Sequence, residues 1–60
     1  DELTVDYLIA VLSMEFEHYD VAAKLLSGIL VSQAANKRIK DRARDLKDDL
    51  RKKMKEQKNG

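Results

Sequence analysis

"YDVAAKLLSGIL", residues 19–30, is the stretch that decides the fold. Its apolar residues recur at intervals of three and four, with one row of Val21, Leu25 and Ile29 beside a second row of Ala22, Leu26 and Leu30. This spacing places both rows on one side of a helix. Asp20 stands before the two rows and is a favourable N-cap residue. The pattern therefore predicts a helix over residues 20–32 with a broad buried face.

Gly28 lies inside this predicted helix. A glycine in a helix interior costs about 1 kcal/mol relative to alanine. A close crossing by another helix would explain why a residue without a side chain stands there.

The preceding segment predicts a helix over residues 2–16 that is apolar on two sides. One row holds Val5, Leu8, Ile9, Leu12 and Phe16, and another side carries Tyr7, Val11 and Met14. A helix that is apolar nearly all round is buried on more than one face. We expect the first row to face the core, through Val5, Ile9, Leu12 and Phe16.

After the connector "SQAAN", residues 32–36, the sequence predicts a third helix over residues 37–57, with Asn36 as its N-cap. One narrow stripe of Ile39, Ala43, Leu46, Leu50 and Met54 runs through an otherwise charged segment. The stripe would cover the open face of the hairpin that the first two helices form. Together with Ala22 and Leu26 of the second helix, Ile39, Ala43, Leu46 and Leu50 complete the predicted core.

Composition favours an all-α fold in a single domain, residues 1–60. The chain has no proline, two glycines and 38% charged residues, and it shows no hairpin turn signal. It has no cysteine, which fits a reducing compartment, so we expect a cytoplasmic protein with no disulfide framework. Its apolar runs are too short to span a membrane. A start at Asp1, without methionine, suggests a fragment of a longer protein.

The stretch "MEFEHYD", residues 14–20, most resembles a chemical site. Glu15 and His18 have the Glu-x-x-His spacing that carboxylate-bridged metal sites use on helices. Such a site needs a second motif of this kind, and His18 is the only histidine in the chain. A polar turn between two helices explains the stretch better. We therefore expect no catalytic residues, no metal and no cofactor, and we do not expect an enzyme.

The charge of the chain is divided between its two halves. Residues 1–35 carry six acids and one base, or −5, and residues 36–60 carry eleven bases and five acids, or +6. The basic segment, residues 37–55, could bind the phosphates of nucleic acid or of anionic lipid. Five acids interrupt the third helix and it has no aromatic residue for stacking, so a solvated helix explains it better. Its apolar stripe would also fit a short coiled coil.

A shift of thirty-four residues places Val5 on Ile39 and Phe16 on Leu50, and thirty-four is the tetratricopeptide period. Around residues 9–30 the chain resembles a tetratricopeptide repeat. The similarity lies in the large-small pair Ile9 and Ala10, in Tyr19 and Ala22 at the start of the second helix, and in Leu26. Glu17 stands in place of the family's turn glycine. The resemblance implies a three-helix unit, an antiparallel helical hairpin plus a capping third helix.

Over almost its whole length the chain is also similar to the C-terminal helical part of a bacterial family called domain of unknown function 2225. The similarity lies in "DELT" with the following "YLI", in "YDVAAKLLSGIL" and in "RIKDRARDLKDDL". Members of that family typically carry a cysteine-bearing region upstream. The family has no assigned activity, so the resemblance implies a fold and no reaction.

These observations predict a non-catalytic module for protein–protein interaction or self-association. Its partner would be another chain or an upstream part of the same protein, with a homo-oligomer as one form. Burial of the first row of the first helix would leave a second side free to bind. The predicted partner-binding face therefore consists of Tyr7, Val11 and Met14 with Arg38, Asp41, Asp45 and Asp48 of the third helix.

Overall fold

The structure, a computed structural model, describes the backbone of residues 2–59 and the side chains of residues 2–56. Within this range the chain forms three helices and no strand: α1 (Glu2–Glu15), α2 (Tyr19–Val31) and α3 (Lys37–Asn59). The sequence pattern placed these helices at 2–16, 20–32 and 37–57. None of the described helices combines the length and the apolar character that crossing a bilayer requires.

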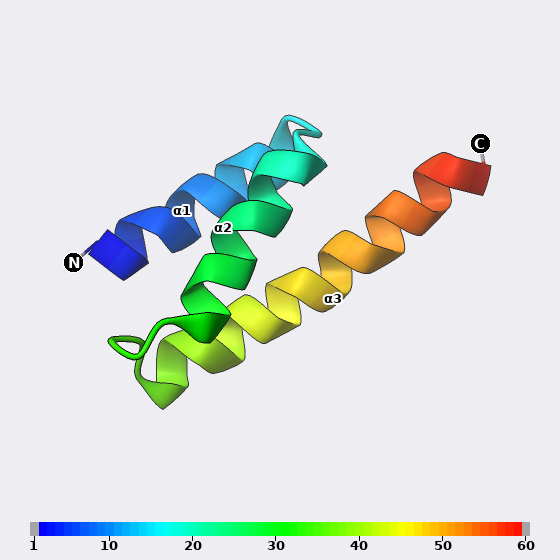
Figure 1. The fold of residues 1–60 in the computed structure, drawn as a ribbon. Helices are drawn as coiled ribbons and strands as arrows, with labels where there is room; N and C mark the ends of the chain where they lie inside the picture. The colour runs from blue at the N-terminus through cyan, green and yellow to red at the C-terminus, as the bar shows by residue number, and fades with distance from the viewer. Residues whose placement is uncertain (1, 60) are drawn as a thin grey trace.

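The three helices are arranged around α2. The first two helices form a hairpin, and α3 runs along α2 and then continues past the hairpin (Figure 1). Helix α2 packs against both neighbours, whereas α1 and α3 contact each other much less. The molecule measures 38 × 17 × 13 Å, and the long dimension follows α3.

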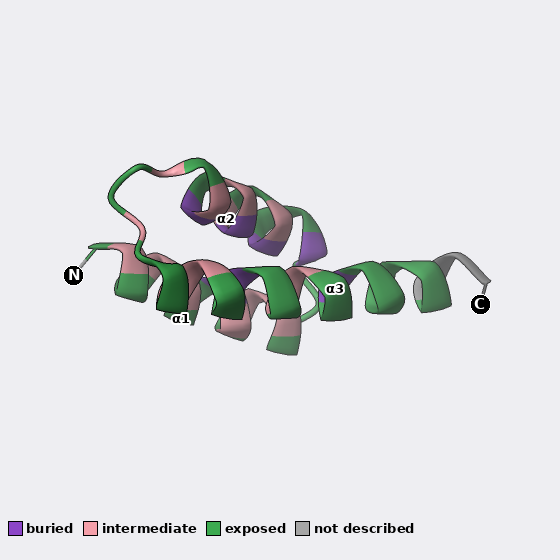
Figure 2. Cartoon of the chain, turned by 90° about the horizontal axis from the view of Figure 1, so that it is seen from below, coloured by how far each residue is buried: buried purple, intermediate pink, exposed green. Residues whose placement is uncertain are grey.

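The core consists mainly of α2 and the small residues that face it. Ala10, Ala22, Leu26 and Ala43 are fully buried, and Tyr19, Ile29 and Leu50 are nearly so. The buried residues of α2 lie along its side turned toward the other helices (Figure 2). Three of the fully buried residues are alanines, one from each helix, and a small side chain lets two helix backbones approach closely. The core positions predicted in α2, Ala22 and Leu26, are confirmed.

The stripe predicted for α3 is largely confirmed as well. Ala43 and Leu50 are buried, and Ile39 and Leu46 are half-buried against the core. Met54 continues the stripe in sequence but is exposed. The buried seam of α3 therefore ends at Leu50.

The core predicted for α1 is wrong. Val5, Ile9, Leu12 and Phe16 are exposed, and the opposite side of the helix faces α2. The inner row, defined as Leu3, Tyr7, Ala10 and Met14, makes the intramolecular contact. Each of these four residues stands thirty-six positions before its counterpart in α3, and the counterparts are Ile39, Ala43, Leu46 and Leu50 in the same order. The expected register of thirty-four differs by two residues, which is about 200° around a helix and so the opposite face.

A Schellman motif ends α1. Glu17 has a left-handed backbone with φ of 63°, and its N–H donates to the carbonyl of Met14 at 3.1 Å. The N–H of His18 donates to the carbonyl of Ser13 at 2.7 Å. These two bonds satisfy carbonyls that the end of a helix otherwise leaves free. The polar stretch around His18 is thus the hairpin turn, as the sequence indicates.

The predicted N-caps have different outcomes. The side-chain oxygen of Asn36 accepts the N–H of Ile39 at 3.0 Å, so Asn36 caps α3 as predicted. The prediction for Asp20 is wrong, because α2 begins one residue earlier and its N-cap is His18, which makes no side-chain cap bond. Asp20 instead lies in the first turn of α2, where its charge suits the helix macrodipole.

The explanation expected for Gly28 is also wrong. The residue is exposed, and no heavy atom outside its own helix backbone and chain neighbours lies within 4 Å of the point where a Cβ would stand. No helix crosses there.

Candidate functional site: the outer row of α1

The side of α1 opposite the inner row carries an unbroken line of large apolar side chains. We call it the outer row, and it consists of Val5 (51% exposed), Leu8 (54%), Ile9 (43%), Leu12 (56%) and Phe16 (71%). The first four lie on α1, and Phe16 follows directly after its last residue. Single exposed apolar residues are ordinary on a protein surface, but contiguous ones mark an interaction site.

The helical period explains why α1 has two apolar sides. At about 100° per residue, Val5, Ile9 and Leu12 fall within a narrow sector of the helix. Tyr7, Ala10 and Met14 fall in the sector diametrically opposite. Helix α1 is therefore a two-sided element, with one side against α2 and the other turned to solvent.

Acidic side chains border the outer row on both sides. Glu2 and Asp6 lie along one border, and Glu15 lies along the other, from the same angular count. Glu2 and Glu15 are exposed and Asp6 is half-buried. The row thus combines apolar area with a negatively charged margin.

The structure separates the residues of the predicted partner-binding face. Tyr7 and Met14 belong to the inner row and pack against the core, and Val11 is half-buried. Asp41, Asp45 and Asp48 are exposed on α3, where Asp41 lies 3.9 Å from Arg44. Tyr7 and Arg38, from two different helices, line the same cavity, and Val11 and Met14 of α1 line a second depression. The apolar side that the sequence assigned to a partner thus lies within the fold.

Glu15 and His18 do not share a helix. Glu15 is the last residue of α1, and the left-handed residue Glu17 separates it from His18. Helical Glu-x-x-His geometry therefore does not apply to this pair. Within the described part of the chain, no three His, Cys, Asp or Glu side chains gather as a metal-ligand set.

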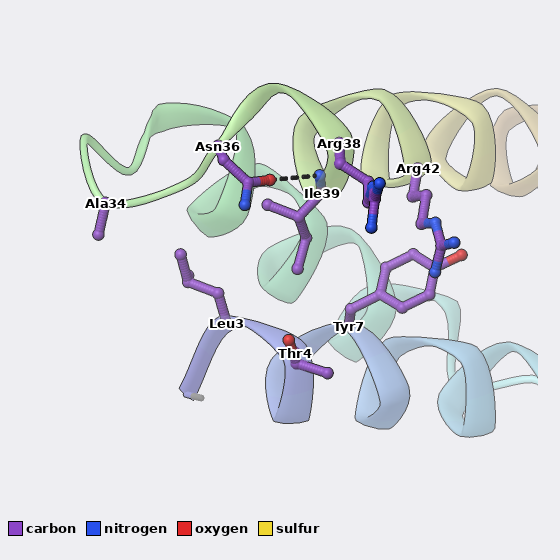
Figure 3. A pocket seen from close by; sticks show the side chains of 8 residues that line it. All are labelled: Leu3, Thr4, Tyr7, Ala34, Asn36, Arg38, Ile39 and Arg42. Carbon is purple, nitrogen blue, oxygen red and sulfur yellow. Dashed lines mark hydrogen bonds between the residues drawn. The ribbon is translucent and has the colours of Figure 1, made fainter.

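A cavity of about 130 Å³ opens at the end of the molecule where α3 begins (Figure 3). It is lined by Leu3, Thr4 and Tyr7 of α1, by Ala34 and Asn36 of the connector, and by Arg38, Ile39 and Arg42 of α3. A second depression lies near the hairpin turn and has Val11, Met14, Glu15, Glu17, Tyr19, Leu46, Asp49 and Lys53 around it.

The described end of α3 forms a third surface of distinct chemistry. Residues 51–56 are all exposed and extend beyond the hairpin (Figure 1). They comprise four bases, Met54 and one acid. This end is the positive counterpart of the acidic hairpin.

Comparison with known proteins gives a match to a family model. No curated protein and no solved structure matches the chain. A family model described as "Uncharacterized protein conserved in bacteria (DUF2225)" matches residues 1–50, which contain all the buried residues of the described core. The chain belongs to this bacterial DUF2225 family.

Proposed function

We propose that this chain is a non-catalytic helical interaction module that binds a partner through the outer row of α1. The observation that carries the proposal is the exposure of five large apolar side chains on the side of α1 opposite the core. Removing such side chains from water is favourable by about 25 cal/mol for each Å² of apolar surface, and this gain offsets the entropy that a complex loses on association. Leu12, at 56%, is the most exposed of the four members that lie on α1 itself.

The partner that fits this surface is an amphipathic helix with a basic margin. The outer row has the i, i+3, i+4, i+7 spacing that two packed helices use for a shared seam. Glu2, Asp6 and Glu15 at its borders favour lysine and arginine on the partner. Two copies of α1 packed on each other would instead bring these acids together, and like charges across an interface are unfavourable.

A tetratricopeptide-like pairing of α1 and α2 is part of this proposal. Ala10, Tyr19, Ala22 and Leu26, which carry the resemblance to that repeat, are all buried. Ile9, the large member of the large-small pair, is exposed and belongs to the outer row. In this proposal the four buried residues hold the hairpin together, and Ile9 contacts the partner helix.

The experiment uses two synthetic amphipathic helices that share one apolar row and differ in their margins, lysine in one and glutamate in the other. We expect the lysine peptide to bind at least about tenfold more tightly, a difference of about 1.4 kcal/mol, and the difference to shrink as salt increases. Fluorescence anisotropy with a labelled peptide measures both affinities.

Matched variants identify the surface. Leu12→Asp should abolish peptide binding, whereas Val31→Asp, at the exposed end of α2, should leave it unchanged. Circular dichroism should show that both variants keep the helical content of the parent chain. Equal binding of both peptides, or loss of helix in Leu12→Asp, would contradict the proposal.

A second candidate function rests on the exposed end of α3. Residues 51–56 extend from the fold with four bases and one acid, a geometry suited to phosphate groups on nucleic acid or anionic lipid. Titration with a generic duplex and with anionic vesicles at low and high salt tests it. Neutralising Arg51, Lys52 and Lys53 together should remove any binding that this segment causes.

A further inference from the structure

The cavity at the start of α3 has cationic groups on one wall and apolar groups beside them. Arg38 and Arg42 come from α3, and both extend toward Tyr7 on α1 (Figure 3). Leu3, Ile39 and Ala34 supply the apolar part of the lining. Its volume of about 130 Å³ corresponds to roughly four water molecules in the liquid, enough for one oxyanion group.

Neither arginine has an acidic partner among the residues whose side chains the structure describes. Within residues 2–56 neither guanidinium forms an ion pair, in contrast to Arg44, which lies 3.9 Å from Asp41 on the same helix. Because Arg38 and Arg42 are four residues apart, they lie on one helix face and repel each other. A bound anion would replace this repulsion with two favourable interactions.

The other polar groups of the lining are suited to the same ligand. Thr4 and Tyr7 present hydroxyl groups, which donate hydrogen bonds to oxyanions. Each guanidinium offers a planar fork that matches two oxygens of a carboxylate or phosphate group. Among the described residues that line the cavity there is no acid to oppose a negative charge.

We propose that this cavity binds an oxyanion, the phosphoryl or carboxyl group of a small ligand whose apolar body lies against Leu3 and Ile39. Arg38 and Arg42 hold the charged group, and Thr4 and Tyr7 donate to its oxygens. This site lies on residues other than the outer row of α1, so it stands or fails independently of the proposed function.

The test is a titration of the whole chain with inorganic phosphate, phenyl phosphate and benzoate, with sodium chloride at matched ionic strength as the reference. Amide signals of Thr4, Tyr7 and Arg38 in heteronuclear NMR spectra report on the cavity. We expect saturable shifts at these residues, with a Kd on the order of 1 mM for so small a ligand. Phenyl phosphate should bind more tightly than inorganic phosphate, and comparison with benzoate distinguishes the phosphoryl from the carboxyl group.

Charge-matched variants decide whether the cavity is responsible. Arg38→Gln with Arg42→Gln should weaken binding by about tenfold or more, because the charge-assisted hydrogen bonds are lost. Arg51→Gln with Lys52→Gln removes the same charge from the exposed end of α3 and should change the affinity less than about twofold at matched ionic strength. If the first pair does not fold, Arg42→Lys keeps the charge but lacks the fork and should weaken binding by about threefold.

Three results would overturn the inference. They are shifts that do not saturate with any of the three oxyanions, an equal loss of affinity in the two charge-matched variants, and shifts no larger in the cavity than at residues 51–56. Each of these would mean that the chain attracts anions only through its general basic charge.

Discussion

At the scale of single residues, the chain places a glycine where the backbone is helical and a glutamate where it is left-handed. Gly28 is an exposed residue inside α2, and Glu17 has a φ of 63° in the turn after α1. Each residue occupies the conformation for which the other is better suited. Both positions therefore offer a simple gain in stability.

Glu17→Gly should raise the free energy of unfolding by about 0.5–1 kcal/mol. Glycine adopts the left-handed region without the Cβ clash, although it also gains freedom in the unfolded chain. Urea denaturation followed by circular dichroism measures the change. Glu17→Ala is the control, since it removes the charge but keeps the Cβ, and an equal gain there would show that charge rather than backbone strain is responsible.

Gly28→Ala should stabilise the chain by a similar amount, about 0.5–1 kcal/mol. The added methyl group meets no neighbour within 4 Å, so only the helix preference of alanine acts. Thermal unfolding should show Gly28→Ser between the parent and the alanine variant, following the order of helix propensity. A loss of stability in Gly28→Ala would mean that another part of the molecule approaches this position.

At the scale of helices, the pattern of apolar residues predicted the core positions of α2 and α3 well. It assigned the wrong face of α1 to the core. Helix α3 has one apolar stripe, so Ala43 and Leu50 could be assigned to the core without ambiguity. Helix α1 has two, and periodicity alone does not say which of them faces the core. The register of thirty-four residues favoured the outer row, yet α1 packs against α2 through the inner row, which contains the fully buried Ala10. The signal that could have decided it was this alanine, set among large residues.

The same limit applies to the candidate site. The sequence indicated an interface on α1 but assigned it to the side of Tyr7 and Met14. An error of two residues in the offset between the apolar rows of α1 and α3 exchanges the buried and the exposed side of α1. The cavity was not predictable, since it combines Thr4 and Tyr7 with Arg38 and Arg42 from a helix far along the chain. Only the packing of α1 and α3 around α2 brings these residues together.

Leu50→Ala should destabilise the chain by about 2–5 kcal/mol, and Met54→Ala by less than about 1 kcal/mol. Both residues continue the same stripe of α3, but Leu50 is 2% exposed and Met54 is 40% exposed. Only the first substitution leaves a cavity in the core. Urea denaturation of both variants measures the difference, and equal losses would show that the buried seam of α3 extends beyond Leu50.

At the scale of the whole molecule, two independent limits fall at the same residue. The match to the family model ends at residue 50, and Leu50 is the last buried residue of the described core. Residues 51–56 are exposed and carry a net charge of +3, from four bases and one acid. The matched residues and the buried core thus end together, and residues 51–56 add no buried residue to the core.

Two truncations test this division. A chain that ends at Lys52 retains Ala43 and Leu50, so its free energy of unfolding should stay within about 1 kcal/mol of the full chain, a shift in Tm of no more than about 8 °C.

A chain that ends at Asn36 loses all of α3 and exposes the face of α2 that covers Ala43 and Leu50. So small a domain has little stability to lose, and the isolated hairpin should not unfold cooperatively. Thermal unfolding followed by circular dichroism compares the three chains. A hairpin that melts like the full chain would show that α3 is not part of the folded unit, and loss of folding at Lys52 would show that the exposed end of α3 supports it.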